Sequence, residues 1–506
     1  DYIRAETMVP NTMHLCSLAR TASEAMSDGA WGVHVATQHA MQPYFANQLG
    51  LFFLSLYQSW MMGANMFYEE DSLFVMWKEE RQCWDDALTS GKRQMLREFY
   101  HFVMTHPRQG YSCRPIAFLE GRYAAPFNGF VCGGEQDPHY SVWGQFGRNL
   151  PEWGHAQPEK CRQLLDVLMP GCLTHPLRQK YEKQRHFFAG TPYGDFDEVP
   201  VESDSGFFHR YKLLLNLGWN TLIPEDYDKL RDFVREGGTL FSGLPQFGTQ
   251  EKRDFTDFRL FRSGDLSELC GIKVFGPTSH EFSGQWNCAG REMIPEVELS
   301  AMPSDFPGED GSCRLAAVEL AGAEVAAWDA VTALPLLTRY RYGKGVVYVI
   351  TAWAYPGHEA LQRFAAAWIH KLAGEHRGEW FVKDPSKEVF WTVRRFDDAR
   401  CGQLFMLNTD WTLPGNRKSV EVHAGALCFD YEVIERVPAM LTVVGSKVLE
   451  TAPKNYLEFC GVHDNSAEFS LHSCGNAVVK VRSAAGVREI SLPATPGGAV
   501  FQVELD

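Results

Sequence analysis

The sequence predicts a mixed α/β chain that ends in an all-β part. Helical and strand patterns alternate over residues 1–110, the alternation continues with longer buried strands over 111–374, and short strands between turn residues fill 375–506. A chain of 506 residues is long enough for two to four domains. We therefore expect three domains, at 1–110, 111–374 and 375–506.

The first segment has the element order of a β/α barrel. Its expected elements are a helix at Thr12–Met26, a strand at Trp31–Gln38, an apolar helix at Phe45–Gly63, a short strand at Asn65–Tyr68 and an amphipathic helix at Gly91–Thr105. This is the order of the last units of a (β/α)8 barrel, and a whole barrel needs roughly 250 residues. We therefore expect 1–110 to be the C-terminal part of such a barrel, and the chain to be part of a longer or two-chain protein.

The second segment reads as a doubly wound α/β domain. Strands are expected at Arg114–Glu120, Tyr211–Leu217 and Gly345–Thr351, helices at Pro158–Leu168, Pro224–Glu236 and His358–Leu372, and an inserted β-rich excursion at 277–335. The third segment reads as a small antiparallel β-sandwich. Its strands are expected at Val389–Val393, Gln403–Leu407, Ser419–Val422, Ala477–Val481 and Val500–Val503.

Charge and composition exclude several classes of partner. The net charge of -15 argues against nucleic acid and anionic membranes. The 13 cysteines are scattered and form no CxxC pair, which argues against a zinc site. We expect them to be mostly reduced, which favours a cytoplasmic or anaerobic setting. Gly-rich nucleotide loops are absent. We therefore expect no metal and no cofactor.

Two adjacent carboxylates stand out at the end of a strand. Glu69 and Glu70 follow Asn65–Tyr68, and carboxylates at the C-terminal end of a barrel strand are where glycoside hydrolases keep their chemistry. Adjacent residues on a strand point to opposite faces, so the two are not expected to form the carboxylate pair that retaining enzymes place about 5–5.5 Å apart. One could face the pocket while the other pairs with a cation behind it. The alternative is a solvated acidic loop.

Neutral polar and aromatic residues near the same strand ends are candidate sugar contacts. Gln38 and His39 lie at the expected rim after the strand that begins at Trp31, and His34 lies on it. His34 could instead be a hydrogen-bonded core histidine. Trp77, just beyond the carboxylates, is a candidate stacking platform for a sugar ring.

Taken in order, the three segments resemble the family 42 type of glycoside hydrolases and their near relatives. The resemblance rests on SLYQSWMMGANMFYEED (55–71), YKLLLNLGWNTLIPEDYDKLRDFVREGGTLFSG (211–243) and RYGKGVVYVITAWAYPGH (341–358). It implies a catalytic (β/α)8 barrel, a flavodoxin-like domain similar to class I amidotransferases that mediates trimerisation, and a small β-domain. It also implies a retaining enzyme that hydrolyses β-linked galactosides or mannosides of an oligosaccharide or polysaccharide, and a homotrimer or other homo-oligomer.

The same resemblance implies an acid/base Glu after barrel strand 4 and a nucleophile Glu after strand 7. Strand 4 would lie outside this segment, in a longer chain or on a companion chain. If Trp31–Gln38 is strand 7, its end offers no carboxylate, whereas if Asn65–Tyr68 is strand 7, Glu69 or Glu70 is the nucleophile. The amidotransferase-like domain has no Cys where its central strand leads into LGWNT (217–221), so we expect it to be catalytically silent. The alternative function is a non-catalytic scaffold subunit or pseudoenzyme of a carbohydrate-processing complex.

Overall fold

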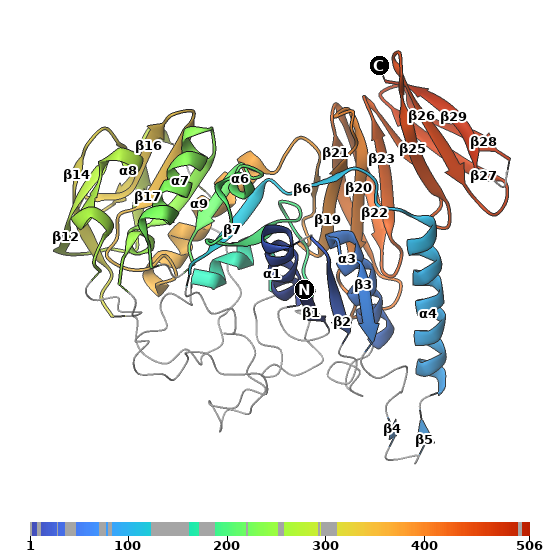
Figure 1. The fold of residues 1–506 in the computed structure, drawn as a ribbon, viewed down its shortest axis with the longest axis horizontal. Coiled ribbons are helices and arrows are strands. Elements are labelled where there is room, and N and C mark those ends of the chain that lie inside the picture. The colour runs from blue at the N-terminus through green and yellow to red at the C-terminus, as the bar shows by residue number, and fades with distance from the viewer. Residues whose placement is uncertain are drawn as a thin grey trace.

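The computed structural model has a mixed α/β architecture with many strands and few helices (Figure 1). It describes residues 3–7, 12–27, 29–35, 47–69, 77–78, 83–84, 86–122, 161–171, 188–218, 221–250, 258–291, 294, 311–493 and 498–505. An N-terminal unit lies between an α/β lobe and a C-terminal β lobe, with helix α1 against strand β8 on one side and helix α3 against strands β19 and β20 on the other (Figure 1).

The N-terminal unit is a parallel sheet covered by helices. Strands β1 (Ile3–Thr7), β2 (Trp31–Val35) and β3 (Met66–Glu69) pair in the order β1-β2-β3, with helices α1 (Thr12–Met26), α3 (Gln48–Met62) and α4 (Asp86–Thr105). A two-stranded ribbon, β4 (Trp77–Lys78) with β5 (Cys83–Trp84), precedes α4. The predicted helix at Thr12–Met26 is confirmed with the same bounds. The predicted strand from Trp31 is confirmed as far as Val35, and its remaining residues lie outside the described part.

Helix α3 is apolar on all sides because it is buried on all sides. The Asn47 side chain accepts a hydrogen bond from the Gly50 N–H at 3.2 Å and so caps its first turn. The helix ends at Gly63, whose φ of 117° is a conformation that residues with a side chain rarely adopt. Here the sequence predicted the end of the helix correctly.

The α/β lobe is built on one eight-stranded sheet in the order β13-β15-β16-β17-β10-β9-β7-β8. Its parallel strands are β7 (Ile116–Glu120), β8 (Asp197–Pro200), β9 (Leu213–Asn216), β10 (Thr239–Gly243) and β17 (Gly345–Ile350). Its helices are α6 (Ser205–Phe208), α7 (Pro224–Arg235), α8 (Ser267–Cys270) and α9 (Glu359–His376). The central strands are buried throughout, which explains why their sequences are continuous apolar runs.

Two predictions in this lobe need correction. The β-rich stretch expected as an insertion in part extends the main sheet. Strand β16 (Pro335–Tyr342) forms a hairpin with β17, β15 (Glu324–Asp329) pairs with β16, and β13 (Trp286–Cys288) pairs with β15. The rest forms a small separate sheet of β11 (Asp265–Leu266), β12 (Ile272–Glu281) and β14 (Arg314–Leu320). The helix expected at Pro158–Leu168 is a 3₁₀ helix at Cys161–Val167, a tighter winding that short segments adopt.

Asp329 fixes the turn between β15 and β16. Its carboxylate accepts hydrogen bonds from the Ser283 N–H at 2.8 Å and hydroxyl at 2.5 Å, and from the Thr332 N–H at 2.7 Å and hydroxyl at 2.8 Å. Burial alone would raise the pKa of this carboxyl, but the hydrogen bonds outweigh burial and lower the pKa to about 2. The ionised form therefore stabilises the folded state.

We expect Asp329→Asn to lower the free energy of unfolding by about 2 kcal/mol at pH 7. This is the stabilisation that corresponds to lowering the pKa of the Asp329 carboxyl from its ordinary value to about 2 in the folded state. Because the folded-state pKa lies below the ordinary one, the stabilisation is present above pH 4 and is lost as the pH falls towards 2. Urea unfolding at pH 7 and at pH 2.5 measures this, and the two proteins should converge at the lower pH. Asp430→Asn, at an exposed strand position, is the control and should change little at either pH. A deficit for Asp329→Asn that persists unchanged at pH 2.5 would contradict the interpretation.

The C-terminal lobe contains three antiparallel sheets. A seven-stranded sheet has the order β28-β27-β24-β23-β20-β19-β6, and two three-stranded sheets have the orders β18-β21-β22 and β25-β26-β29. The strands are β18 (Phe381–Lys383), β19 (Val389–Arg395), β20 (Cys401–Asn408), β21 (Arg417–Ala424), β22 (Leu427–Ile434), β23 (Ala439–Val444), β24 (Lys447–Glu450), β25 (Tyr456–His463), β26 (Ser466–His472), β27 (Ala477–Ser483), β28 (Gly486–Leu492) and β29 (Ala499–Glu504). Strand β6 (Tyr111–Cys113) comes from before the α/β lobe, yet it pairs with β19.

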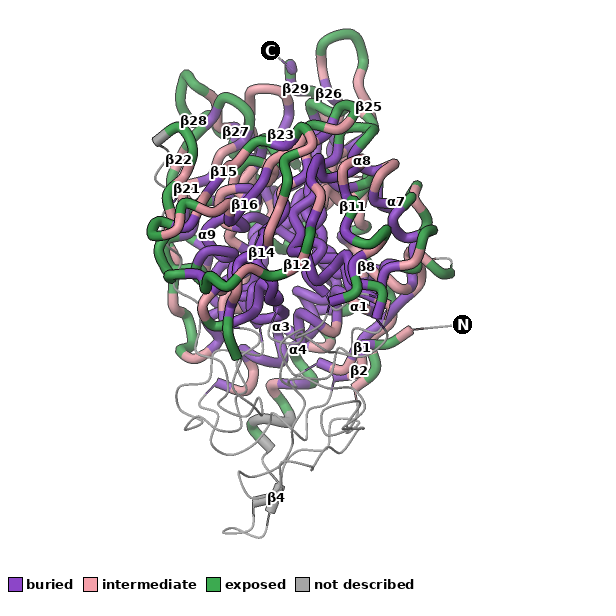
Figure 2. Tube along the Cα trace, turned by 90° about the vertical axis from the view of Figure 1, so that its left-hand side faces the viewer, coloured by how far each residue is buried: buried purple, intermediate pink, exposed green. Residues whose placement is uncertain are grey.

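The largest hydrophobic core is shared by all three parts of the chain. It runs through the N-terminal unit and the α/β lobe and includes Phe390, Phe405 and Leu407 of β19 and β20. Figure 2 shows buried segments filling the interior of the molecule. The other face of these two strands, with Trp391 and Leu404, packs into a separate core of the C-terminal lobe. Both faces of these strands are therefore buried.

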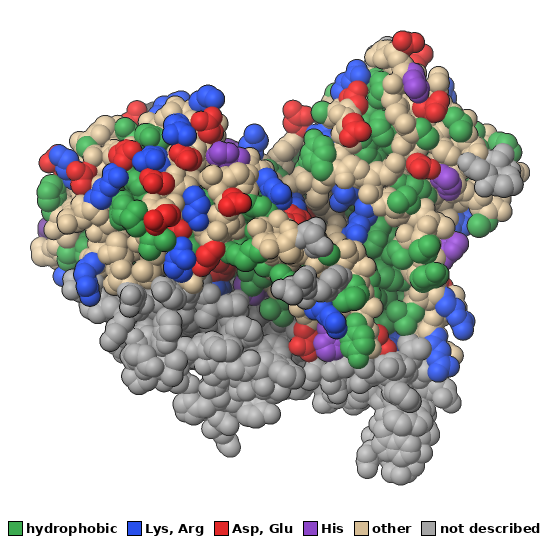
Figure 3. All heavy atoms as spheres, viewed as in Figure 1, with side chains coloured by type: hydrophobic (Ala, Val, Ile, Leu, Met, Phe, Trp, Pro, Cys, Tyr) green, Lys and Arg blue, Asp and Glu red, His purple; other side chains and the backbone are tan. Residues whose placement is uncertain are grey.

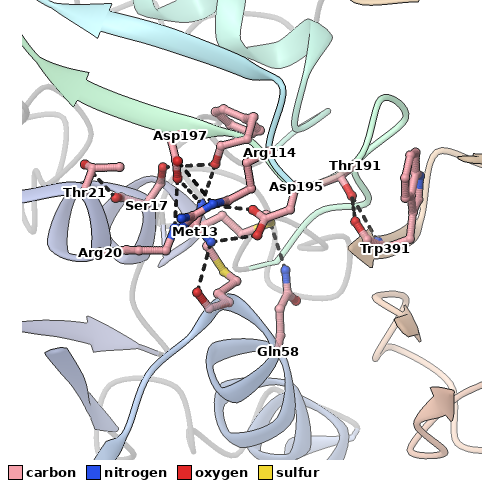
Figure 4. A network of polar contacts seen from close by, with 12 residues as sticks. Met13, Ser17, Arg20, Thr21, Gln58, Arg114, Thr191, Asp195, Asp197 and Trp391 are labelled. Carbon is pink, nitrogen blue, oxygen red and sulfur yellow. Dashed lines mark hydrogen bonds and ion pairs between the residues drawn. The ribbon is translucent and has the colours of Figure 1, made fainter. Parts of the chain in front are cut away.

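A buried charge network joins the N-terminal unit to the α/β lobe (Figure 4). Arg20 of α1 donates to Asp195 at 2.7 and 3.1 Å and to Asp197 at 2.6 and 2.9 Å. Its guanidinium also reaches the backbone carbonyls of Met62 and Phe196. The Arg20, Asp195 and Asp197 side chains are each 1% exposed. Every donor direction of this arginine is thus used inside the protein.

The network is electrostatically balanced. Arg114 lies 3.3 Å from Asp197 and 2.8 Å from Glu24, and the Tyr211 hydroxyl donates to Asp197 at 2.8 Å. Burial would raise the pKa of Asp197, but the charges of Arg114 and Arg20 outweigh burial and lower it. Burial would likewise lower the pKa of Arg20, and the carboxylates raise it instead. The network is therefore an ion-pair cluster that holds the two parts of the chain together.

Candidate functional site

The candidate site lies at the carboxyl edge of the N-terminal sheet. The described parts of the three strands end in one row of paired residues, Thr7, Val35 and Glu69. The carboxyl edge of parallel β/α units is where barrel enzymes place their catalytic groups. The sequence predicted that the ends of β2 and β3 would open on one edge, and the pairing of these strands agrees with that expectation.

Glu69 lies on the face of the sheet that the helices cover. It shares this face with the buried residues Val35 and Val33, and Lys92 of helix α4 donates to its Oε1 at 2.5 Å. The Lys92 side chain is 1% exposed, and its ammonium group lies 5.5 Å from the centre of the Phe52 ring. Glu69 is therefore one half of a largely buried ion pair on the helical side of the sheet.

The opposite face carries a row of polar and aromatic side chains. Glu6, His34 and Tyr68 are paired neighbours on β1, β2 and β3, one residue before the end of each strand. The rings of His34 and Tyr68 are 5.2 Å apart, Arg4 lies 5.9 Å from the centre of the Tyr68 ring, and Tyr68 is 48% exposed. A carboxylate, an imidazole and a phenol side by side can accept and donate hydrogen bonds to sugar hydroxyls.

Sequence reasoning found one member of this row and missed two. His34 was named as a candidate, whereas Glu6 and Tyr68 were not. The signal that could have found them is strand register, because Tyr68 precedes Glu69 and so must face the side away from it. The remaining predicted residues, Glu70, Gln38 and His39, lie outside the described residues. Trp77 begins the short strand β4, but its side chain also lies outside what is described.

The carboxyl ends of β7 and β9 lie side by side at the position where such sheets often bind ligands. Chain order reverses between β7 and β9, which is the usual crevice position in this architecture. Here Arg162 donates to both oxygens of Glu120 at 3.0 and 2.5 Å, and the Gly218 N–H donates to the Leu119 carbonyl at 3.2 Å. A Cβ on Gly218 would lie only 2.6 Å from the Gly121 nitrogen. The two strand ends are therefore held in direct contact.

Two cysteines flank the first strand expected in this lobe, Cys113 and Cys132. Cys113 lies in β6, and burial raises the pKa of its thiol despite the nearby charge of Arg395. It is therefore held in the unreactive thiol form at neutral pH. Cys132 lies outside the described residues.

One group of side chains in the described part of the chain has metal-ligand types within reach of each other. On strands β21 and β22, His423 Nε2 lies 2.5 Å from Glu421 Oε1 and 3.7 Å from Cys428 Sγ. Lys383 also donates to Glu421 Oε1 at 2.6 Å. This carboxylate oxygen is already bound by an ammonium group, so we assign no metal there. Within the described ranges, no helix combines the length and apolarity that crossing a bilayer requires.

Comparisons with known proteins give a weak likeness in fold to glycoside hydrolases. No family model matches the chain, and no curated protein matches it. The chain is similar to the GH42 β-galactosidase Gan42B (15% identity, TM-score 0.45, 85% of this chain and 56% of that one). It is also similar to a β-galactosidase from Bacillus circulans sp. alkalophilus (14%, 0.47, 86% and 58%) and to α-L-fucosidase isoenzyme 2 from Paenibacillus thiaminolyticus (10%, 0.43, 97% and 62%).

The chain thus spans about 56 to 62% of the length of these three structures. At these identities and TM-scores the likeness assigns neither a family nor an activity. The matched proteins belong to one broad class, enzymes that hydrolyse glycosides, and they differ in the sugar that they act on.

Proposed function

We propose that the carboxyl edge of the N-terminal sheet carries a glycoside hydrolase site for β-linked glycans of the β-galactoside or β-mannoside class. The observation that supports this is the row of Glu6, His34 and Tyr68 on the face of the sheet away from the helices. A carboxylate beside neutral donors and an exposed ring suits the binding of a sugar. We propose Gln38, His39 and Trp77 as further sugar contacts.

Of the two adjacent carboxylates, Glu70 is the better candidate for the nucleophile. Glu69 faces the helices and is bound by Lys92, whereas a residue that follows it in an extended chain would face the same side as His34. Retaining hydrolysis needs a second carboxylate, as acid/base, about 5–5.5 Å from the nucleophile. We propose that this second carboxylate lies outside the segment, upstream in a longer protein or on a companion chain, and that the α/β lobe forms a homotrimer or another homo-oligomer.

A non-catalytic scaffold is the second candidate function. The Glu69–Lys92 ion pair favours it, because it gives one of the two acidic residues a structural role. The core shared by all three parts of the chain would suit a rigid assembly subunit equally well.

The test is hydrolysis of aryl β-glycosides by the full-length protein. We expect hydrolysis of a β-galactoside or a β-mannoside, and we expect Glu6→Gln to lower kcat/KM by roughly ten- to a thousandfold, as for a residue that orients a sugar hydroxyl. Glu319→Gln, at an exposed position on β14, is the control and should leave the rate unchanged. A folded protein that hydrolyses neither glycoside would favour the scaffold.

A further inference from the structure

A cleft lies at the opposite end of the sheets from the candidate site. It has a volume of about 1100 Å³ and is lined by residues of all three parts of the chain. Gly29 precedes β2, Arg114 precedes β7 and Lys212 precedes β9, so the cleft opens at the amino ends of the parallel strands. Figure 3 shows the surface hollowed between the α/β lobe and the C-terminal lobe, with Lys and Arg side chains around the hollow.

The cleft is cationic although the protein is acidic. Its lining includes six basic side chains, Arg114, Arg210, Lys212, Arg377, Arg394 and Arg395, against four carboxylates. Two of these carboxylates, Asp195 and Asp197, are already bound by the buried Arg20. In the described part of the chain, Lys212, Arg377 and Arg394 form no ion pair with a carboxylate. The whole chain has a net charge of -15, so a cleft with more basic than acidic side chains suggests a binding site for an anion.

Arg394 shows the surplus most clearly. Its guanidinium donates to the backbone carbonyls of Gln109 at 2.8 Å and Gly110 at 2.6 Å. Burial, together with repulsion from Arg108 and Arg114, lowers the pKa of Arg394 to about 10. Burial also lowers the pKa of Arg377 and of Arg395. An anion bound among these groups would relieve the repulsion between them.

One residue that lines the cleft has a buried donor without a partner in the described part of the chain. Trp391 is 2% exposed, and its indole N–H has no hydrogen-bond acceptor among the described residues. Leaving a buried donor unpaired costs about 1–3 kcal/mol. At the rim, Tyr111 is 57% exposed and offers an aromatic face.

We propose that this cleft binds an acidic saccharide through its carboxylate or sulfate groups. Guanidinium groups pair with these oxyanions in a fixed planar geometry, the indole N–H can donate to a ligand oxygen, and the exposed ring can cover a sugar face. Pockets for small ligands have volumes of about 300–1000 Å³, so this cleft is large enough for an oligosaccharide. The saccharide part of the ligand rests on the proposed function, whereas the anionic part does not.

The test is isothermal titration calorimetry on the full-length protein with three separate probes. These are trigalacturonate, a neutral trisaccharide made of galactose, and inorganic phosphate. We expect trigalacturonate to bind at least about tenfold more tightly than either other probe, and its affinity to fall as NaCl is raised. The double variant Lys212→Gln, Arg377→Gln should weaken trigalacturonate binding by about tenfold or more. Lys480→Gln with Arg488→Gln, two exposed positions on β27 and β28, removes the same charge and should not weaken binding.

Three results would overturn the inference: no binding of trigalacturonate, equal binding of the neutral trisaccharide, or equal loss of affinity in the two double variants. Binding of phosphate as tight as that of trigalacturonate would overturn the saccharide class. If the double variant is unstable, Lys212→Gln alone provides the same comparison. Because the readout is binding, a protein that binds trigalacturonate but hydrolyses no glycoside would contradict only the proposed catalytic function.

Discussion

Replacing Arg20 with methionine should lower the free energy of unfolding by about 3–5 kcal/mol, which is the usual cost of leaving a buried charge without its partner. Methionine keeps much of the side-chain volume but removes the guanidinium that donates to Asp195, to Asp197 and to the two backbone carbonyls, while Arg114 and Tyr211 still contact Asp197. Asp195 would then have no cation in direct contact among the described residues. Since domains are stable by about 5–15 kcal/mol, urea unfolding should show the change clearly.

The matched control is Arg210→Met. Arg210 belongs to the same cluster, but its side chain is 52% exposed and it pairs with Glu24 alone, at 3.1 Å. An exposed ion pair contributes about 0–1 kcal/mol, so this variant should unfold almost like the wild type. If both variants lose the same small amount, the network does not join the N-terminal unit to the α/β lobe in the way that its contacts indicate.

The two adjacent glutamates should respond to substitution in opposite ways. Glu70→Gln should lower kcat on an aryl β-glycoside by roughly a thousandfold or more without a loss of stability, as expected for a nucleophile. Glu69→Gln should keep kcat within about tenfold of the wild type. It should instead lower the free energy of unfolding by about 3 kcal/mol, because Lys92 would be left buried without its partner.

The control for this pair is the double variant Glu69→Gln, Lys92→Met, in which neither charge remains. Its loss of stability should be smaller than the sum of the two single losses, because removing both partners leaves no uncompensated charge. Loss of activity in Glu69→Gln with no change in stability would mean that Glu69, and not Glu70, acts on the substrate.

Local features of the fold could be predicted from the sequence. The bounds of helix α1 and the end of α3 at Gly63 follow from periodicity and from glycine's tolerance of positive φ, both of which act over a few residues. Pairing between distant segments could not be predicted in this way. Strand β6 pairs with β19 across almost the whole α/β lobe, and no local pattern in Tyr111–Cys113 indicates its partner.

Only part of the candidate site could be predicted, because the rest depends on contacts between distant segments. The two adjacent carboxylates at the end of β3 and the histidine on β2 stand out as residue types in a strand context. The structural role of Glu69 depends on Lys92, which comes from a helix further along the chain. The contribution of Glu6 depends on the register of β1 with β2. Ion-pair partners and strand register are set by the tertiary structure, so they cannot be predicted from a single sequence.

The most direct test of the central proposal is covalent labelling of the full-length protein with 2-deoxy-2-fluoro β-glycosides of galactose and mannose, followed by peptide mass spectrometry. A retaining glycosidase forms a glycosyl ester on its nucleophile, and the fluorine substituent slows hydrolysis of that ester enough to isolate it. We predict one label, on the peptide that contains Glu70, and no label in Glu70→Gln. A label on a carboxylate elsewhere in the protein, or an active enzyme that is never labelled, would contradict the proposal that the end of β3 supplies the nucleophile.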